Sequence, residues 1–164
     1  MLTAFAAQIT IPLGFTPVPI TGQTFAVLMT GAVLGSRAGA ASQFLYVAMG
    51  AVGLPFYADG ASGWETATGA TGGYFVGFIL AAYAVGLLAE GKADRRFSTS
   101  IGAFLTGNLI IYVVGVAWLM RTFSWDLATG VELGVAPFLI GDTVKILLAA
   151  SLMPAAWKLA GNRR

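Results

Sequence analysis

The sequence predicts an all-α integral membrane protein built from six transmembrane helices, and three observations predict it. Of the 164 residues, 57% are hydrophobic and only 10% are charged, whereas a typical soluble domain has roughly 25% charged residues. The mean hydropathy is +0.81. The apolar residues gather in long runs that short polar or charged turns separate. Because so few charges cannot form a polar shell, we expect one domain, residues 1–164, with lipid as its solvent.

Six apolar runs mark the predicted spans. They cover residues 1–11, 20–35, 38–54, 70–89, 98–120 and 133–157. A helix needs about 20 residues to cross the hydrocarbon core of a bilayer. The first run is too short, because 11 residues of helix rise only about 16 Å against a core of about 30 Å. We therefore expect a truncated first helix, part of which lies upstream of Met1.

Basic residues fall almost entirely on one side of the predicted membrane. Six alternating spans place together Arg37, Lys92, Arg95, Arg96, Lys158, Arg163 and Arg164. Arg121 lies on the opposite side, and Lys145 lies within a span. The positive-inside rule then predicts a multi-pass protein of the cell membrane with both termini in the cytoplasm.

Several classes of function are excluded by residues that the chain lacks. It contains no cysteine and no histidine, so disulfides, thiol chemistry, the commonest metal ligand and the commonest acid–base group are absent. The segment GLLAEGKA, residues 86–93, has the spacing of a P-loop but ends in alanine where serine or threonine should bind Mg²⁺. The net charge of +2 gives no case for nucleic acid. We predict no catalytic residues, no metal and no cofactor.

The segment FLIGDTVKILLAA, residues 138–150, carries two charges in an otherwise apolar helix. Asp142 and Lys145 are three residues apart and therefore share one side of the helix. A lone charge at the bilayer centre costs about 2.5–3.5 kcal/mol on insertion scales, so such groups pair, face a cavity or bind a ligand. We expect a polar ligand site, in which Lys145 receives an anionic group and Asp142 accepts hydrogen bonds. A structural ion pair without a ligand is the alternative.

Polar residues elsewhere are weaker candidates for a site. Asn108 and Tyr112 share a face of the predicted fifth span, either as ligand contacts or as hydrogen bonds between helices. The segment TPVPITGQT, residues 16–24, is expected to be extended, as a wall or lid of a site or as an ordinary loop. The segment GATGGYF, residues 69–75, brings Tyr74 to the membrane interface. Close helix contacts are expected at the pairs Gly31/Gly35, Gly35/Gly39 and Gly73/Gly77.

Five segments in order resemble the BioY family. They are PVPITGQTFAVLMTGAVLG, GAVGLPFYADG, GATGGYFVGF, GNLIIYVVGVAWL and PFLIGDTVK. The resemblance runs from about residue 8 to residue 150. BioY proteins are the substrate-binding, or S, components of energy-coupling factor (ECF) vitamin transporters, and they bind biotin. The resemblance implies six membrane helices, a ligand on the outer side under loops 12–22 and 55–71, and no hydrolytic activity. It also implies a membrane coupling protein and two ATP-binding subunits as partners.

The chemistry of biotin agrees with the polar and aromatic residues described above. Biotin has a carboxylate tail, a ureido ring with two N–H donors and one carbonyl, and apolar ring atoms. Lys145 suits an oxygen of the ligand, Asp142 suits the ureido N–H groups, and Gln23 and Asn108 suit either. Aromatic side chains can enclose the apolar part. The predicted substrate-binding residues are Gln23, Phe56, Tyr74, Asn108, Tyr112, Asp142 and Lys145.

The sequence also allows other functions. The chain could carry biotin alone, without ATPases, or serve as the S component for another small vitamin. A different class is an ion-coupled transporter in which Asp142 and Lys145 relay protons. In a purely structural membrane subunit, the two charges would only pair with each other.

Overall fold

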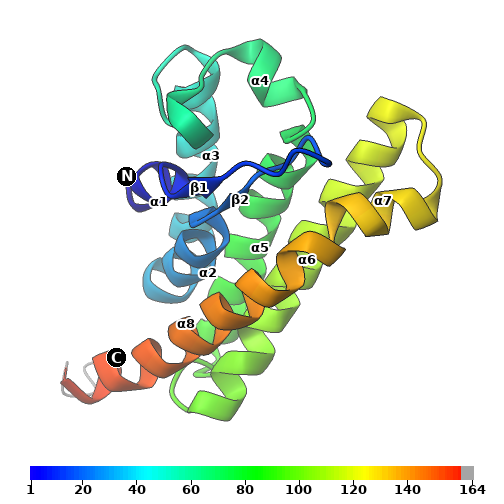
Figure 1. Ribbon diagram of the computed structural model, residues 1–164. Coiled ribbons are helices and arrows are strands. Elements are labelled where there is room, and N and C mark those ends of the chain that lie inside the picture. Colours follow the sequence, from blue (N-terminus) through cyan, green and yellow to red (C-terminus); the bar gives the residue numbers. More distant parts are fainter. Residues whose placement is uncertain (160–164) are drawn as a thin grey trace.

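The computed structural model describes residues 1–159, and its ribbon is made almost entirely of helices (Figure 1). In chain order the elements are α1 (Leu2–Ala7), β1 (Thr10–Ile11), β2 (Ile20–Thr21), α2 (Gln23–Leu34), α3 (Ser36–Ala51), η1 (Ala58–Gly60), α4 (Trp64–Thr68), α5 (Gly72–Glu90), α6 (Phe97–Phe123), α7 (Leu127–Gly134), η2 (Ala136–Phe138) and α8 (Leu139–Leu159). The prediction of an all-α fold is confirmed. A small antiparallel sheet of β1 and β2 is added to it, in which Thr10 pairs with Thr21 and Ile11 with Ile20.

Three helical segments of the described chain are long and apolar enough to cross a membrane. They are Gly72–Glu90, Phe97–Phe123 and Leu127–Lys158, the last of which joins α7, η2 and most of α8. Helix α2 is apolar but has only 12 residues, and α3 has 16. The count of six spans therefore remains a prediction.

The first two predicted runs, 1–11 and 20–35, are not continuous helices. Helix α1 ends after six residues, and the chain then forms the β1–β2 hairpin. The backbone N–H of Gly22 donates to the carbonyls of Ala6 (3.1 Å) and Ile9 (2.9 Å), which returns the chain to the end of α1. Prolines in residues 12–19 further disfavour helix, because proline lacks an N–H donor. We call residues 12–19 the strap.

Residues 121–132 lie between the predicted spans 98–120 and 133–157, and the sequence predicts a loop there. This prediction is wrong, because most of the segment is helical. Helix α6 continues to Phe123 and ends at Ser124, which has a left-handed conformation. Helix α7 then begins after Asp126, whose side chain accepts a 3.0 Å hydrogen bond from the Thr129 N–H and so caps the helix. The predicted span 133–157 is broken between α7 and α8. Pro137 lies in the break and cannot supply a helical N–H.

Helix α5 lies between α3, α2 and α6 and carries much of the buried core. Small residues allow these helices to approach closely, as the Gly31 and Gly73 pairs predict. A Cβ at Gly31 would lie 2.6 Å from the Ala82 carbonyl oxygen, and one at Gly73 would lie 2.8 Å from that of Val114. Gly35 has another role, because its φ of +82° forms the turn between α2 and α3.

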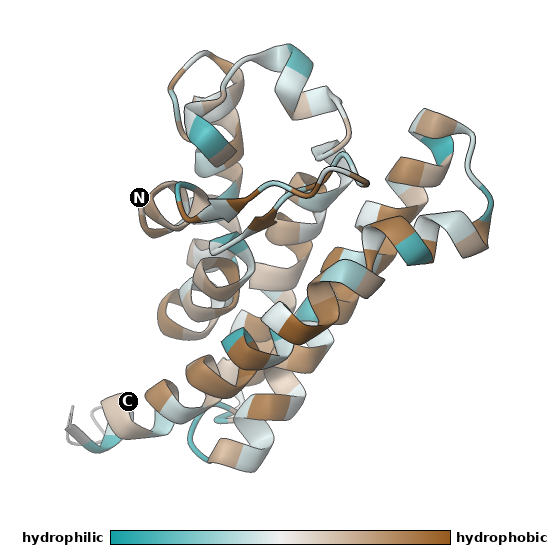
Figure 2. Ribbon diagram, in the orientation of Figure 1, coloured by the Kyte–Doolittle hydropathy of each residue, from teal (hydrophilic) through white to brown (hydrophobic). Residues whose placement is uncertain are grey.

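Two turns carry most of the described basic residues, and we call them the basic turns: the α2–α3 turn with Arg37 and the α5–α6 turn, residues 91–96. They lie at one end of the molecule. Ser36 N and Oγ donate to the Glu90 carboxylate at 2.7 and 2.8 Å, which joins the α2–α3 turn to the end of α5. Trp157 Nε1 donates to Asp94, which joins α8 to the α5–α6 turn. Figure 2 shows hydrophilic residues at this end and apolar residues along α6 and α8. Arg163 and Arg164 lie outside the described residues. Helices α4 and α7 lie at the opposite end (Figure 1).

Candidate functional site

The charged pair on α8 forms the centre of the candidate site. Helix α8 begins at Leu139, so Asp142 lies in its first turn and Lys145 one turn later. Lys145 Nζ lies 2.7 Å from Asp142 Oδ1. Asp142 is only 3% exposed, so protein atoms enclose most of its side chain. The prediction that the two side chains share one side of the helix is confirmed.

Two other helices supply hydroxyl groups to this pair. Thr24 of α2 donates to Asp142 Oδ1 at 2.9 Å and accepts from Lys145 Nζ at 3.1 Å. Tyr112 of α6 donates to Asp142 Oδ2 at 2.6 Å. The carboxylate thus accepts bonds from three side chains on three helices. Such charge-assisted bonds offset the cost of burying a carboxylate.

Gln23, at the start of α2, extends the polar wall away from the pair. Its Oε1 accepts a 2.8 Å hydrogen bond from Thr21, and its Nε2 donates to the Tyr46 hydroxyl at 2.5 Å. Gln23 is buried. Both ends of its amide are therefore oriented by neighbours, which gives this wall one defined arrangement of donors and acceptors.

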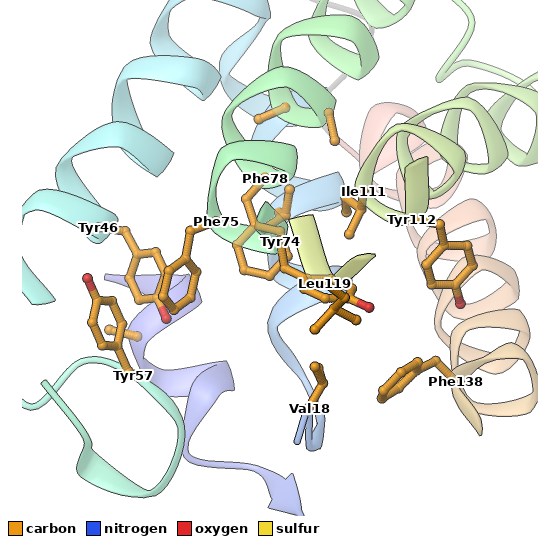
Figure 3. Packing of buried hydrophobic residues seen from close by; sticks show 14 residues of the cluster. Val18, Tyr46, Tyr57, Tyr74, Phe75, Phe78, Ile111, Tyr112, Leu119 and Phe138 are labelled. Carbon is orange, nitrogen blue, oxygen red and sulfur yellow. The ribbon is translucent and has the colours of Figure 1, made fainter. Parts of the chain in front are cut away.

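A cavity of about 290 Å³ lies between the strap, α2, α5, α6, α8 and residues 57–71. Its volume is near the lower end of the range of about 300–1,000 Å³ that is typical of small-molecule sites. Six rings line it, those of Tyr57, Tyr74, Phe75, Phe78, Tyr112 and Phe138. Figure 3 shows these rings spread from Tyr57 and Phe75 on one side to Tyr112 and Phe138 on the other, with Val18 of the strap between them. The polar lining includes Thr21, Gln23, Thr24, Asp59, Asp142 and Lys145. An apolar body with a few fixed polar groups suits a small, partly polar ligand.

The tyrosine rings of the cavity are held by hydrogen bonds to main-chain carbonyls. Tyr74 donates to the Gly134 carbonyl at the end of α7, at 2.7 Å. Tyr57 donates to the Val47 carbonyl at 2.7 Å, and its ring stacks on Phe75 at 4.5 Å. Burial raises the pKa of the Tyr57 hydroxyl. Both hydroxyls are thus occupied, and these residues offer the cavity mainly their rings.

The outer walls of the cavity come from the strap and from residues 57–71. Pro17, Val18 and Pro19 line it from the strap. The strap is attached to α7 by Thr16, whose Oγ1 donates to the Leu133 carbonyl at 2.8 Å. The segment TPVPITGQT thus lies in the wall of the cavity.

Five of the seven predicted site residues line this cavity, and two do not. Gln23, Tyr74, Tyr112, Asp142 and Lys145 belong to the lining. Phe56 instead lines a second pocket beside α1 and α3.

The two residues outside the lining lie next to residues that belong to it. Tyr57 takes the place in the lining that the sequence assigned to Phe56. Asn108 lies one turn of α6 from Tyr112 and hydrogen-bonds its side chain. Asn108 is buried, and its Oδ1 has no hydrogen-bond partner among the described residues.

Sequence reasoning did not find several lining residues. Thr24 follows Gln23 directly, but its contact with Asp142 could not be predicted from the sequence. The contact depends on the packing of α2 on α8. Phe75 and Phe78 are three residues apart on α5, a spacing that is typical of core residues on one face of a helix. Tyr57 was detectable only as part of the LPFYADG loop. These residues meet through tertiary contacts, which no local spacing encodes.

Comparisons with known proteins agree with this geometry. The model of the BioY family matches residues 1–162. The chain belongs to the BioY family. The biotin transporter BioY of Thermotoga maritima is 38% identical over 99% of this chain and 93% of its own length. The probable biotin transporter BioY of Pyrococcus horikoshii is 39% identical over 98% of this chain and 91% of its own.

A solved structure extends the comparison to the fold. The crystal structure of the S-component for biotin from an ECF-type ABC transporter has a TM-score of 0.84 to this chain. The two are 28% identical over 96% of this chain and 87% of that one. The resemblance drawn from the sequence is thus confirmed. BioY is a family of transporter components, so the chain is a membrane protein and not an enzyme.

Proposed function

We propose that this chain is a high-affinity biotin-binding S component that mediates biotin uptake, with the cavity beside Asp142 and Lys145 as the biotin site. The observation that carries the proposal is an acid–base pair, a buried Asp142 and a partly exposed Lys145, on the wall of an aromatic cavity. The names of its relatives, biotin transporters, supply the ligand.

The donors and acceptors of the cavity complement those of biotin. Asp142 accepts N–H bonds from the ureido group, whereas Lys145 donates to a carbonyl or carboxylate oxygen. Gln23 serves either role. Tyr74 and Tyr112 contact the apolar ring atoms. Phe56 and Asn108, which do not line the cavity, are left out of this contact set.

We assign the basic end of the molecule to the cytoplasm, with both termini on that side of a multi-pass protein. The cavity would then open toward the outside, because the strap and residues 57–71 lie away from the basic turns. A membrane coupling protein and a pair of ATP-binding subunits would supply energy. This chain would bind the vitamin and would hydrolyse nothing.

Calorimetry on the purified protein tests the proposal. A buried site with several charge-assisted bonds gives an expected Kd in the nanomolar range, about −12 kcal/mol. The same protein is titrated with thiamine, riboflavin and other vitamins, for which we expect no heat. A folded protein that gives no heat with biotin would contradict the proposal. Heat with another vitamin instead would make the chain an S component for that ligand.

A further inference from the structure

We propose that Gln8 is a positioning residue that holds the outer wall of the cavity closed over the ligand. The inference rests on the proposed function, because it assigns Gln8 a role in biotin retention. Gln8 does not line the cavity and is exposed at the end of α1. Its effect would pass through the turn of residues 57–61, which we call the outer turn.

The Gln8 amide bridges α1 and the outer turn with three hydrogen bonds. Its Nε2 donates to the Ala4 carbonyl at 3.1 Å and to the Tyr57 carbonyl at 3.0 Å. Its Oε1 accepts from the Gly60 N–H at 3.0 Å. The position needs a donor for one backbone group and an acceptor for another, which a glutamine amide provides and a glutamate carboxylate does not. The pattern of donors and acceptors is therefore specific to glutamine, which favours a structural role for this side chain.

The outer turn forms part of the cavity wall and has an unfavourable backbone. Tyr57, Ala58, Asp59 and Ala61 line the cavity. Asp59 has a φ of +55°, which is uncommon for residues other than glycine. A turn of this kind persists only where surrounding contacts determine it. Gln8 supplies two such contacts, one at each end of the Tyr57–Gly60 segment.

The same end of α1 also fixes the strap on the other side of the cavity. Gly22, which follows the β1–β2 hairpin, donates to the carbonyls of Ala6 and Ile9 on either side of Gln8 in sequence. The end of α1 therefore connects the two outer walls. The inner wall has its own connections through Thr24, Tyr112 and Asp142. Loss of Gln8 should loosen the outer turn and leave the inner wall intact.

The test compares Gln8→Ala and Gln8→Glu with the control Ile9→Ala. Ile9 is the next residue and is 71% exposed, so its truncation should change little. Removing two hydrogen bonds to the outer turn should speed biotin dissociation by roughly 5-fold or more. Hydrogen exchange of the Gly60 amide should accelerate in Gln8→Ala. Gln8→Glu retains the acceptor for this amide, so it should preserve more of the protection while still losing the bond to Tyr57.

A second variant separates positioning from general instability. If Gln8 acts only on the outer wall, Lys145→Ala should cost the same factor in affinity with and without Gln8→Ala, because distant, independent sites add. Exchange in α8 should be unchanged. Wild-type protein that fails to bind biotin would overturn the proposed function. Wild-type protein that binds, with dissociation from Gln8→Ala equal to that from Ile9→Ala, would overturn the inference about Gln8 alone.

Discussion

A single carboxylate organises the inner wall of the site. Asp142 accepts hydrogen bonds from Thr24, Tyr112 and Lys145, which belong to α2, α6 and α8. Replacing a buried ion pair by apolar residues is often neutral or stabilising, so the fold by itself gives weak reason to keep one. A ligand that presents both N–H donors and oxygen acceptors gives such a reason. The pair is therefore better explained as part of a binding site than as a purely structural ion pair.

Lys145→Ala and Asp142→Asn should each weaken biotin binding about 10-fold or more, roughly 1.4 kcal/mol upwards. Each change removes one charge and leaves the other without its counter-ion. Calorimetry on purified variants measures the loss. Thr143→Ala is the matched control on α8, because its exposed hydroxyl bonds only the Leu139 carbonyl. Unchanged affinity in both charge variants, with the fold intact, would favour the purely structural pair.

Tyr112→Phe should weaken binding less, by roughly 3- to 10-fold, because one bond to a charged group is lost while two donors to Asp142 remain. The exposed Tyr83→Phe on α5 controls for hydroxyl removal in general. Affinities of both variants are measured by the same titration. A loss larger than that of Asp142→Asn would mean that the Tyr112 hydroxyl contacts biotin directly.

At the scale of elements, the contact between α5 and α6 sets the width of the cavity, since both helices line it. Gly73→Ala should destabilise this contact by about 1–3 kcal/mol, the usual cost of overpacking. Its Cβ would collide with Trp118 and lie 2.8 Å from the Val114 carbonyl oxygen. Thermal unfolding in detergent measures the change.

The chain offers a matched glycine for this experiment. A Cβ at Gly102 on α6 meets nothing within 4 Å, so Gly102→Ala should keep or slightly raise stability through helix propensity. Equal melting temperatures for the two variants would show that α5 and α6 can separate without cost.

Elements with a local signal were predictable, and those made by distant contacts were not. The runs 70–89 and 98–120 correspond closely to α5 and α6, because the charged turn 90–96 separates them. The β1–β2 hairpin was not predicted, because it depends on hydrogen bonds from the Gly22 N–H to the carbonyls of Ala6 and Ile9. The site divides in the same way. Asp142 and Lys145 are three residues apart and were found together, whereas Thr24 joins them from 118 residues away.

For the whole molecule, the cavity and the basic turns lie at different levels of the bundle. The cavity lies beneath the strap and residues 57–71. The turns that carry Arg37, Lys92 and Arg96 meet at the other end, where Glu90 and Asp94 are engaged by Ser36 and Trp157. This polarity suits a subunit that collects a vitamin on one face of the membrane and meets its partners within the membrane or on the other face. The proposed function assigns the energy for uptake to separate coupling and ATP-binding subunits, and this assignment can be tested.

Biotin uptake should therefore collapse in cells that express this chain but lack every coupling and ATP-binding subunit. Purified protein from the same cells should still bind biotin, because the site lies within this chain. Radiolabelled uptake measures the first quantity and calorimetry the second. Cells that do not express this chain set the background of the uptake assay, and a titration of buffer sets that of calorimetry. Full uptake without the other subunits would make the chain a solitary transporter.

The energy source can be tested in the same cells with the subunits restored. An ATP-driven complex should continue uptake when a protonophore dissipates the proton gradient and ATP is held constant. If Asp142 and Lys145 relay protons, uptake should instead stop at once, because each transport step would need protons driven by the gradient. In the relay, Asp142→Asn would abolish uptake even at biotin concentrations that saturate the variant. In a binding subunit, saturating biotin should restore much of the rate, because the carboxylate contributes affinity rather than a transported proton.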